Sequence, residues 1–128
     1  MATVNVLDYK ELYLKTAKDY LDSLSKSCNK LAYNPLDRKA LTQLHISSHS
    51  LRSQSQVMGY ISISSITSEI EKIARAVLEG KYNINTNIIS VFKEVIMAIN
   101  VLLSDVEKNN TKKNVDTLLE KLQGVSKR

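Results

Sequence analysis

ISISSITSEIEKIARAVLEG, residues 61–80, decides between a sheet and a helical fold. Its isoleucines are β-branched and suit strands, but a strand would place apolar residues at alternate positions. The apolar residues recur instead at steps of three and four, as Ile63, Ile66, Ile70, Ile73 and Val77. That spacing gathers them on one face of a helix. The stretch therefore predicts an amphipathic helix that continues up to Gly80.

Two helices are predicted before this stretch. The first covers residues 6–31 and ends near Pro35, because the residue before a proline is pushed out of the helical conformation. The second starts near Leu36 or Asp37 and closes at Gly59. The predicted buried stripes of the two helices are Leu7, Leu14, Ala17, Leu21, Leu24, Cys28 and Leu31, and then Leu41, Leu44, Ser48, Leu51, Ser55 and Met58.

Two more helices are predicted after it. The loop KYNINTN offers Asn85 or Thr86 as a helix cap, and a broad apolar face follows over residues 88–106. The members of that face are Ile88, Ile89, Phe92, Val95, Ile96, Ile99, Leu102, Leu103 and Val106. A polar break then precedes a weaker fifth helix at about 112–124, with Val115, Leu118, Leu119 and Leu122 as its apolar residues.

Length and composition fit one all-helical domain. The chain has 128 residues with only 3 Gly and 1 Pro, which leaves few turn residues for a many-stranded sheet. Long helices with short connections favour antiparallel neighbours. We therefore expect a single domain over residues 1–128: an up-and-down antiparallel four-helix bundle at about 6–106, with the fifth, C-terminal helix packed on it.

Charge and cysteine content limit the partners and the compartment. The net charge of +5 comes without any stretch that interleaves basic residues with aromatic ones, so a solvated surface is favoured over nucleic-acid binding. Charges at Asp8, Lys10 and Glu11 interrupt the N-terminal apolar residues. The segment therefore matches neither the apolar core of a signal peptide nor a membrane span. The single cysteine, Cys28, fits a reducing compartment and a place in the core. A cytoplasmic protein without a membrane or nucleic-acid partner is expected.

Motifs for nucleotide or metal chemistry are missing from the sequence. It has no glycine-rich phosphate loop, no GxSxG turn and no HExxH, so no bound cofactor is expected. His45 and His49 stand four residues apart on one helix face, a spacing able to hold a metal ion. Further ligands are lacking, so two surface histidines that share a face are favoured over a metal site.

The segment SHSLRSQSQVMGY, residues 48–60, resembles the phosphorylation-site helix of histidine phosphotransfer (HPt) domains, above all the N-terminal domain of CheA-type chemotaxis kinases. In that family the pattern reads AHTLKG followed by MGF. His49 falls on the phosphoacceptor histidine, Arg52 on the family's lysine and Ser53 on its glycine, while residues 58–60 match the closing triplet. The resemblance further places Glu71 where CheA-type domains carry the glutamate that bonds the histidine ring, and Ser68 where they often have a second histidine.

The chemistry of these residues suits phosphoryl transfer. A neutral imidazole attacks phosphorus through one nitrogen while the other holds a proton, and Glu71 could fix that proton by accepting a hydrogen bond. Arg52, one turn beyond His49, and Gln56 are candidate contacts of the phosphoryl oxygens. Small or polar residues near His49 would leave space for a partner to dock; these are Ser50, Ser53, His45 and Ser68.

The resemblance implies a phosphoryl carrier of two-component signalling. His49 would accept the phosphoryl group from ATP bound to a separate histidine kinase catalytic domain and pass it to an aspartate on a response-regulator receiver domain. ATP and Mg²⁺ would be supplied through those partners. The chain would be an excised domain of a CheA-like kinase, which the position of His49 favours, or a free-standing phosphorelay protein. The alternatives are an HPt-like interaction module that is not phosphorylated and, as a weaker candidate, a basic nucleic-acid-binding domain.

Overall fold

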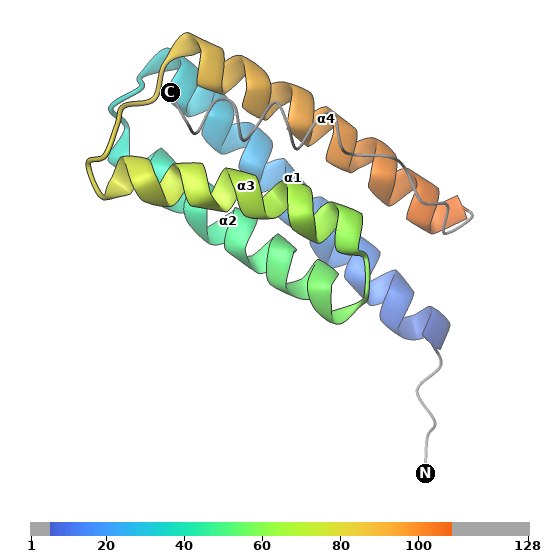
Figure 1. Cartoon of the computed structure of the whole chain (residues 1–128). Coiled ribbons are helices and arrows are strands. Elements are labelled where there is room, and N and C mark those ends of the chain that lie inside the picture. Colours follow the sequence, from blue (N-terminus) through green and yellow to red (C-terminus); the bar gives the residue numbers. More distant parts are fainter. Residues whose placement is uncertain (1–5, 109–128) are drawn as a thin grey trace.

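A computed structural model describes residues 6–108 of the chain. Four helices account for the regular structure in this range: α1 (Val6–Tyr33), α2 (Arg38–Val57), α3 (Ile61–Leu78) and α4 (Thr86–Lys108). Each packs on its neighbours in chain order, and α4 also packs on α1, so the helices close an up-and-down bundle (Figure 1). The predicted all-helical fold with four bundle helices is confirmed. The fifth helix predicted at about 112–124 lies outside the described residues, and the single domain over 1–128 stays a prediction.

Two glycines end α2 and α3 in the same way. Gly59 and Gly80 have φ angles of 82° and 79°. Glycine adopts this left-handed conformation at little cost in free energy, because it has no Cβ. At Gly59 the backbone N–H donates to Gln56 O, and the next N–H donates to Ser55 O. The equivalent pair of bonds follows Gly80. Both ends are Schellman motifs, which satisfy carbonyls that the helix leaves without partners and turn the chain sharply. Both glycine stops predicted from the sequence are confirmed.

Side-chain caps begin α2 and α4. Asp37 Oδ1 accepts from Ala40 N at 3.0 Å, and Asn85 Oδ1 accepts from Ile88 N at 2.8 Å. Between α1 and α2, Asn34 Oδ1 accepts from Leu36 N across Pro35 and closes a tight turn. The two caps satisfy free N–H groups at the first turns of α2 and α4. The turn at Asn34 reverses the chain, so α2, which carries His49, runs antiparallel to α1 (Figure 1).

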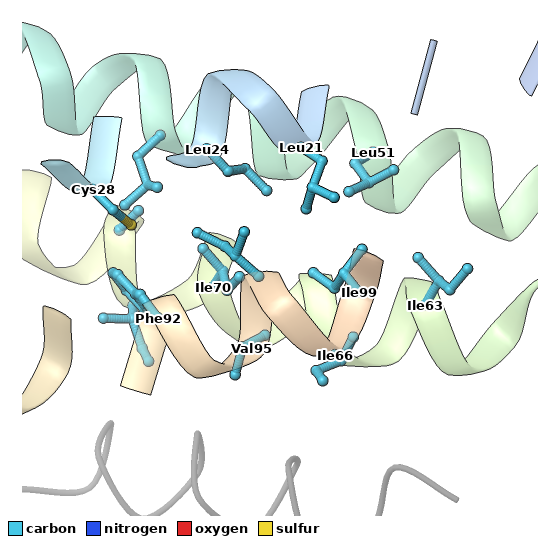
Figure 2. Packing of buried hydrophobic residues seen from close by; sticks show 14 of the residues in the cluster. Leu21, Leu24, Cys28, Leu51, Ile63, Ile66, Ile70, Phe92, Val95 and Ile99 are labelled. Carbon is cyan, nitrogen blue, oxygen red and sulfur yellow. The ribbon is translucent and has the colours of Figure 1, made fainter. Parts of the chain in front are cut away.

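The core contains the predicted stripes (Figure 2). Within residues 8–108 every predicted position is buried except Met58 and Val77, which are partly buried near the ends of their helices, while the burial predicted for Leu7 lies outside the described side chains. Cys28 is fully buried, and burial raises the pKa of its thiol to about 12. The helix α4 has the length and mean hydropathy, 1.6, of a membrane span. Its fully apolar face, however, lies against the other helices as part of this core.

Small and polar residues let α1 and α2 approach closely. Ser47, Ser48 and Ser55 are buried on α2. The Ser48 hydroxyl donates to the His45 carbonyl in the preceding turn, as serine does inside helices. The Ser55 hydroxyl pairs instead with Tyr13 of α1 at 2.7 Å. The Ser47 hydroxyl pairs with Ser23 of α1 at 2.7 Å, so all three of these buried hydroxyls have partners, two of them across the α1–α2 contact.

Candidate functional site

His49 and Glu71 join the middle of α2 to the middle of α3. His49 Nδ1 lies 2.8 Å from Glu71 Oε2. The His49 side chain is 55% exposed, while that of Glu71 is only 4% exposed. Glu71 follows the fully buried Ile70, and this position turns its carboxylate along the seam between the two helices. The structure thus brings together the two residues that the sequence paired 22 positions apart.

Two arginines bind the same carboxylate. Arg52 Nε donates to Glu71 Oε1 at 2.5 Å, and Arg75 Nη2 donates to Oε2 at 3.0 Å. Burial by itself raises the pKa of Glu71, but the hydrogen bonds from Arg52 and His49 and the positive charge of Arg52 outweigh it and lower that pKa overall. Glu71 is therefore an ionised, buried hydrogen-bond acceptor.

The ionised carboxylate determines which ring nitrogen of His49 carries the proton. If Nδ1 had no proton, its lone pair would face the Glu71 Oε2 lone pairs at 2.8 Å, which is repulsive. Arg52 Nη2 also lies 3.1 Å from Nδ1, but it can donate there only to an unprotonated nitrogen. The contact with the carboxylate is shorter and charge-assisted. We therefore assign the proton to Nδ1, which donates to Glu71 and leaves a free lone pair on Nε2.

The expected phosphoryl contacts have other partners in the structure. Arg52 is directed at Glu71, and its Nη1 donates to Gln56 Oε1 at 3.3 Å. Gln56 therefore reaches the site through Arg52. Contact of either side chain with a phosphoryl group stays a prediction. Arg75 was not among the predicted site residues; its place four residues after Glu71 on the same helix was the available signal.

The expected docking residues differ in their surroundings. Ser53 is exposed, Ser50 and Ser68 are partly exposed, and none of them contacts Glu71 in the described hydrogen bonds. His45 is partly buried, and its Nε2 is buried without a hydrogen-bond partner. Within residues 8–108, no three histidine, cysteine, aspartate or glutamate side chains gather in the manner of metal ligands.

An apolar groove begins at Ser53, one turn from His49. It has a volume of about 290 Å³ and lies between the N-terminal part of α1 and the C-terminal part of α2. Its most exposed apolar members are Tyr9, Leu12 and Val57, at 53%, 63% and 84%. The lining residues are Tyr9, Leu12, Tyr13, Thr16, Ser53, Gln54, Val57 and Met58. We call this set the α1–α2 groove. Exposed apolar surface of this kind is typical of a protein-binding site.

Two solved structures have the fold of this chain. One is the phosphorylated P1 domain of CheA3 from R. sphaeroides in complex with CheY6, with a TM-score of 0.87, 15% sequence identity, and coverage of 94% of this chain and 97% of that chain. The other is the solution structure of the histidine phosphotransfer domain of CheA, with a TM-score of 0.84, 16% identity, and coverage of 92% and 91%. No protein-family model and no curated protein matches the sequence. The chain therefore has the fold of the CheA phosphotransfer domain.

Proposed function

We propose that this chain is a histidine phosphotransfer domain of chemotaxis-type two-component signalling. His49 Nε2 accepts a phosphoryl group from ATP bound to a separate histidine kinase catalytic domain, and then gives it to an aspartate of a response-regulator receiver domain. The observation that carries the proposal is the pair of His49 with the buried, ionised Glu71, which leaves Nε2 exposed as a nucleophile. Because such partners are cytoplasmic, we place the domain in the cytoplasm.

The transfer needs little from this chain beyond a positioned nitrogen. The Nε2 lone pair attacks the γ-phosphorus, a P–N bond forms, and the P–O bond to ADP breaks with its electron pair leaving on ADP. Positive charge develops on the ring during the attack, and Glu71 stabilises it through the Nδ1 proton. In the second transfer an aspartate oxygen attacks phosphorus, and the P–N electron pair returns to Nε2. ATP and Mg²⁺ are supplied by the partner domains.

The charges around Glu71 match an incoming phosphoryl group. Arg52 and Arg75 bring two positive charges against one carboxylate. The surplus positive charge lies beside a ring that becomes attached to a dianion. Arg52 is only 26% exposed and lies 3.1 Å from the ring, so a change of rotamer brings its guanidinium to the phosphoryl oxygens. This is the role that lysine has in the family pattern.

The α1–α2 groove is the surface on which we expect the receiver domain to dock. The groove continues directly from the His49 face of α2, since Ser53 and Val57 follow His49 at steps of four. A solved structure with this fold was determined in complex with CheY6. A receiver seated in the groove would have its aspartate near Nε2.

The proposal is tested by phosphorylation and a chase. Radiolabelled ATP, Mg²⁺ and several CheA-type catalytic cores are incubated with the wild-type chain, with His49→Gln, and with His45→Gln as the matched control one turn away. We expect acid-labile label on the wild type and on His45→Gln, none on His49→Gln, and loss of label to an added receiver domain. If cores that phosphorylate their own P1 domains never label this chain, the proposal is wrong and an interaction module becomes the better account.

A further inference from the structure

We propose that Arg75 is a positioning residue that keeps the Glu71 carboxylate turned toward His49 and so keeps the Nε2 lone pair free. Its effect on the tautomer of His49 follows from the geometry alone. Its effect on phosphorylation rests on the proposed function. The sequence pattern that identifies His49 does not assign any role to Arg75.

The carboxylate of Glu71 is held on both of its oxygens. Arg52 of α2 binds Oε1 and Arg75 of α3 binds Oε2, the oxygen that also accepts from His49 Nδ1. A carboxylate bonded through one oxygen can rotate about its terminal torsion, which is broad and has low barriers. A carboxylate bonded through both oxygens has a fixed plane. Without Arg75 the only described donor to Oε2 is His49 Nδ1 itself, so in the tautomer that lacks this proton the carboxylate is bonded through Oε1 alone. Arg75 therefore supplies the bond that fixes the direction of Oε2 in both tautomers.

The direction of Oε2 matters because a competing donor lies next to it. Arg52 Nη2 is 3.1 Å from His49 Nδ1 and can donate a hydrogen bond there as soon as that nitrogen lacks a proton. If Glu71 turns away, Nδ1 then accepts from Arg52, and the ring proton moves to Nε2. A protonated Nε2 has no lone pair with which to attack phosphorus. Arg75 thus acts on His49 indirectly. It keeps Glu71 in the position that accepts from Nδ1, and this prevents Arg52 from donating to that nitrogen.

Burial separates this arrangement from an ordinary surface ion pair. Arg75 is 53% exposed and stands four residues after Glu71, a spacing that contributes little to stability when both partners are solvated. Glu71, however, is only 4% exposed, so water does not readily replace a lost donor. The described charged or titratable groups that bond it are His49 and Arg52 from α2 and Arg75 from α3. We therefore expect loss of Arg75 to change the tautomer more than the stability.

The neighbouring Lys72 provides a matched control. It lies on α3, is 63% exposed, and pairs with Glu69 instead of Glu71. Arg75→Met and Lys72→Met each remove one exposed cation and one ion pair from the same helix. Arg75→Lys restores a cationic donor at the position. A change that is seen in Arg75→Met, absent from Lys72→Met and reversed in Arg75→Lys can only arise from the bond to Glu71.

Nitrogen NMR of histidine-labelled protein measures the tautomer directly. At about pH 9, well above the ordinary imidazole pKa, the wild type and Lys72→Met should show a protonated Nδ1 and an unprotonated Nε2 at His49. In Arg75→Met the two nitrogen shifts should move toward each other as the second tautomer becomes populated, and Arg75→Lys should return them toward wild type. Unchanged shifts in a folded Arg75→Met protein would overturn the proposal.

The phosphorylation rate separates this inference from the proposed function. With a CheA-type catalytic core, Arg75→Met should be phosphorylated about tenfold more slowly than wild type, a smaller loss than the roughly 10²-fold that a 1 Å misplacement of a reacting group can cause. If the tautomer changes but the rate does not, the proposed consequence for transfer is wrong. If the wild type is never phosphorylated while its tautomer depends on Arg75, the proposed function is wrong and the positioning role stands.

Discussion

The Nδ1 atom of His49 and the Oε2 atom of Glu71 lie 2.8 Å apart across the seam between α2 and α3. The donor is half exposed and the acceptor is buried. This asymmetry lets the bundle hold one ring nitrogen while the other faces solvent. Phosphoryl transfer through an exposed histidine requires this arrangement, because the nucleophilic atom has to enter the active site of a partner.

Replacement of Glu71 by glutamine should slow phosphorylation of His49 strongly. The amide has the same shape as the carboxylate but no charge to stabilise the developing imidazolium, so we expect a loss on the order of 10²-fold with a CheA-type core. Glu69→Gln is the matched control, because Glu69 is also buried on α3 and pairs with Lys72. Equal rates for wild type and Glu71→Gln, measured from initial labelling, would contradict the role of Glu71.

The Tyr13–Ser55 hydrogen bond should contribute to stability through its burial. Tyr13→Phe leaves the fully buried Ser55 hydroxyl without this partner, which should lower the free energy of unfolding by about 1–3 kcal/mol. Ser55→Ala should have a similar cost. The double variant should lose less than the sum of the two, because both partners are then absent. Urea denaturation of the four proteins gives the coupling, and strictly additive losses would show that the contact contributes nothing.

The Cys28 thiol should be unreactive in the native protein. It is fully buried, and its pKa is raised from 9.0 to about 12. A thiol reagent at neutral pH should therefore modify the native chain at least about 10³-fold more slowly than the chain in denaturant, because reaction requires opening of the core. Rapid modification of the native protein would contradict the placement of Cys28.

The same raised pKa predicts a loss of stability at alkaline pH. The unfolded thiol ionises at lower pH than the folded one, so its contribution is fully present below about pH 9 and disappears as the pH rises through about 12. Cys28→Ala should lose less stability over this range than wild type. Denaturation midpoints at several pH values measure both slopes, and parallel slopes would exclude a contribution from Cys28.

A charge in the α1–α2 groove should weaken transfer to the receiver. Val57 is 84% exposed at the last residue of α2, where a cation is compatible with the helix dipole, so Val57→Lys should fold normally. We expect transfer from phosphorylated Val57→Lys to a receiver to be about tenfold slower, equivalent to about 1.4 kcal/mol of lost docking energy. Met97→Lys, at a 70% exposed position on α4, is the control. Equal transfer by both variants would place the docking surface elsewhere.

The sequence was sufficient for the fold and for the central pair of the site. Apolar spacing, the two glycine stops, the helix start near Leu36 or Asp37 and the cap at Asn85 or Thr86 are local signals. The structure bears out the spacing and the stops, and it selects Asp37 and Asn85 as the caps. The pairing of His49 with Glu71 followed from the resemblance and from the position of Glu71 at the edge of a buried stripe. Packing of α2 on α3 then brings the two residues together.

The remaining contacts depend on how the helices rotate against each other and on the rotamers that result. Spacing alone could not show that Arg52 would bind Glu71 Oε1 in preference to solvent, or that Arg75 would donate to Oε2, the oxygen that also accepts from His49. The bond between Tyr13 and Ser55 joins residues 42 positions apart, so it requires the rotation of α1 on α2 to be known. Figure 1 shows α1 packed beside α2. The sequence predicts only that helices consecutive in the chain are neighbours, and not how they are rotated against each other.

The bond that forms on His49 is the most direct test of the account. The chain, labelled with nitrogen-15 in histidine, is phosphorylated by a CheA-type catalytic core with Mg²⁺ and ATP, and phosphorus–nitrogen coupling then identifies the bonded atom. We predict one phosphoryl group, on Nε2 of His49, while Nδ1 keeps its proton toward Glu71. A phosphoryl group on Nδ1 or on His45, or none at all from cores that phosphorylate their own P1 domains, would contradict the central claim.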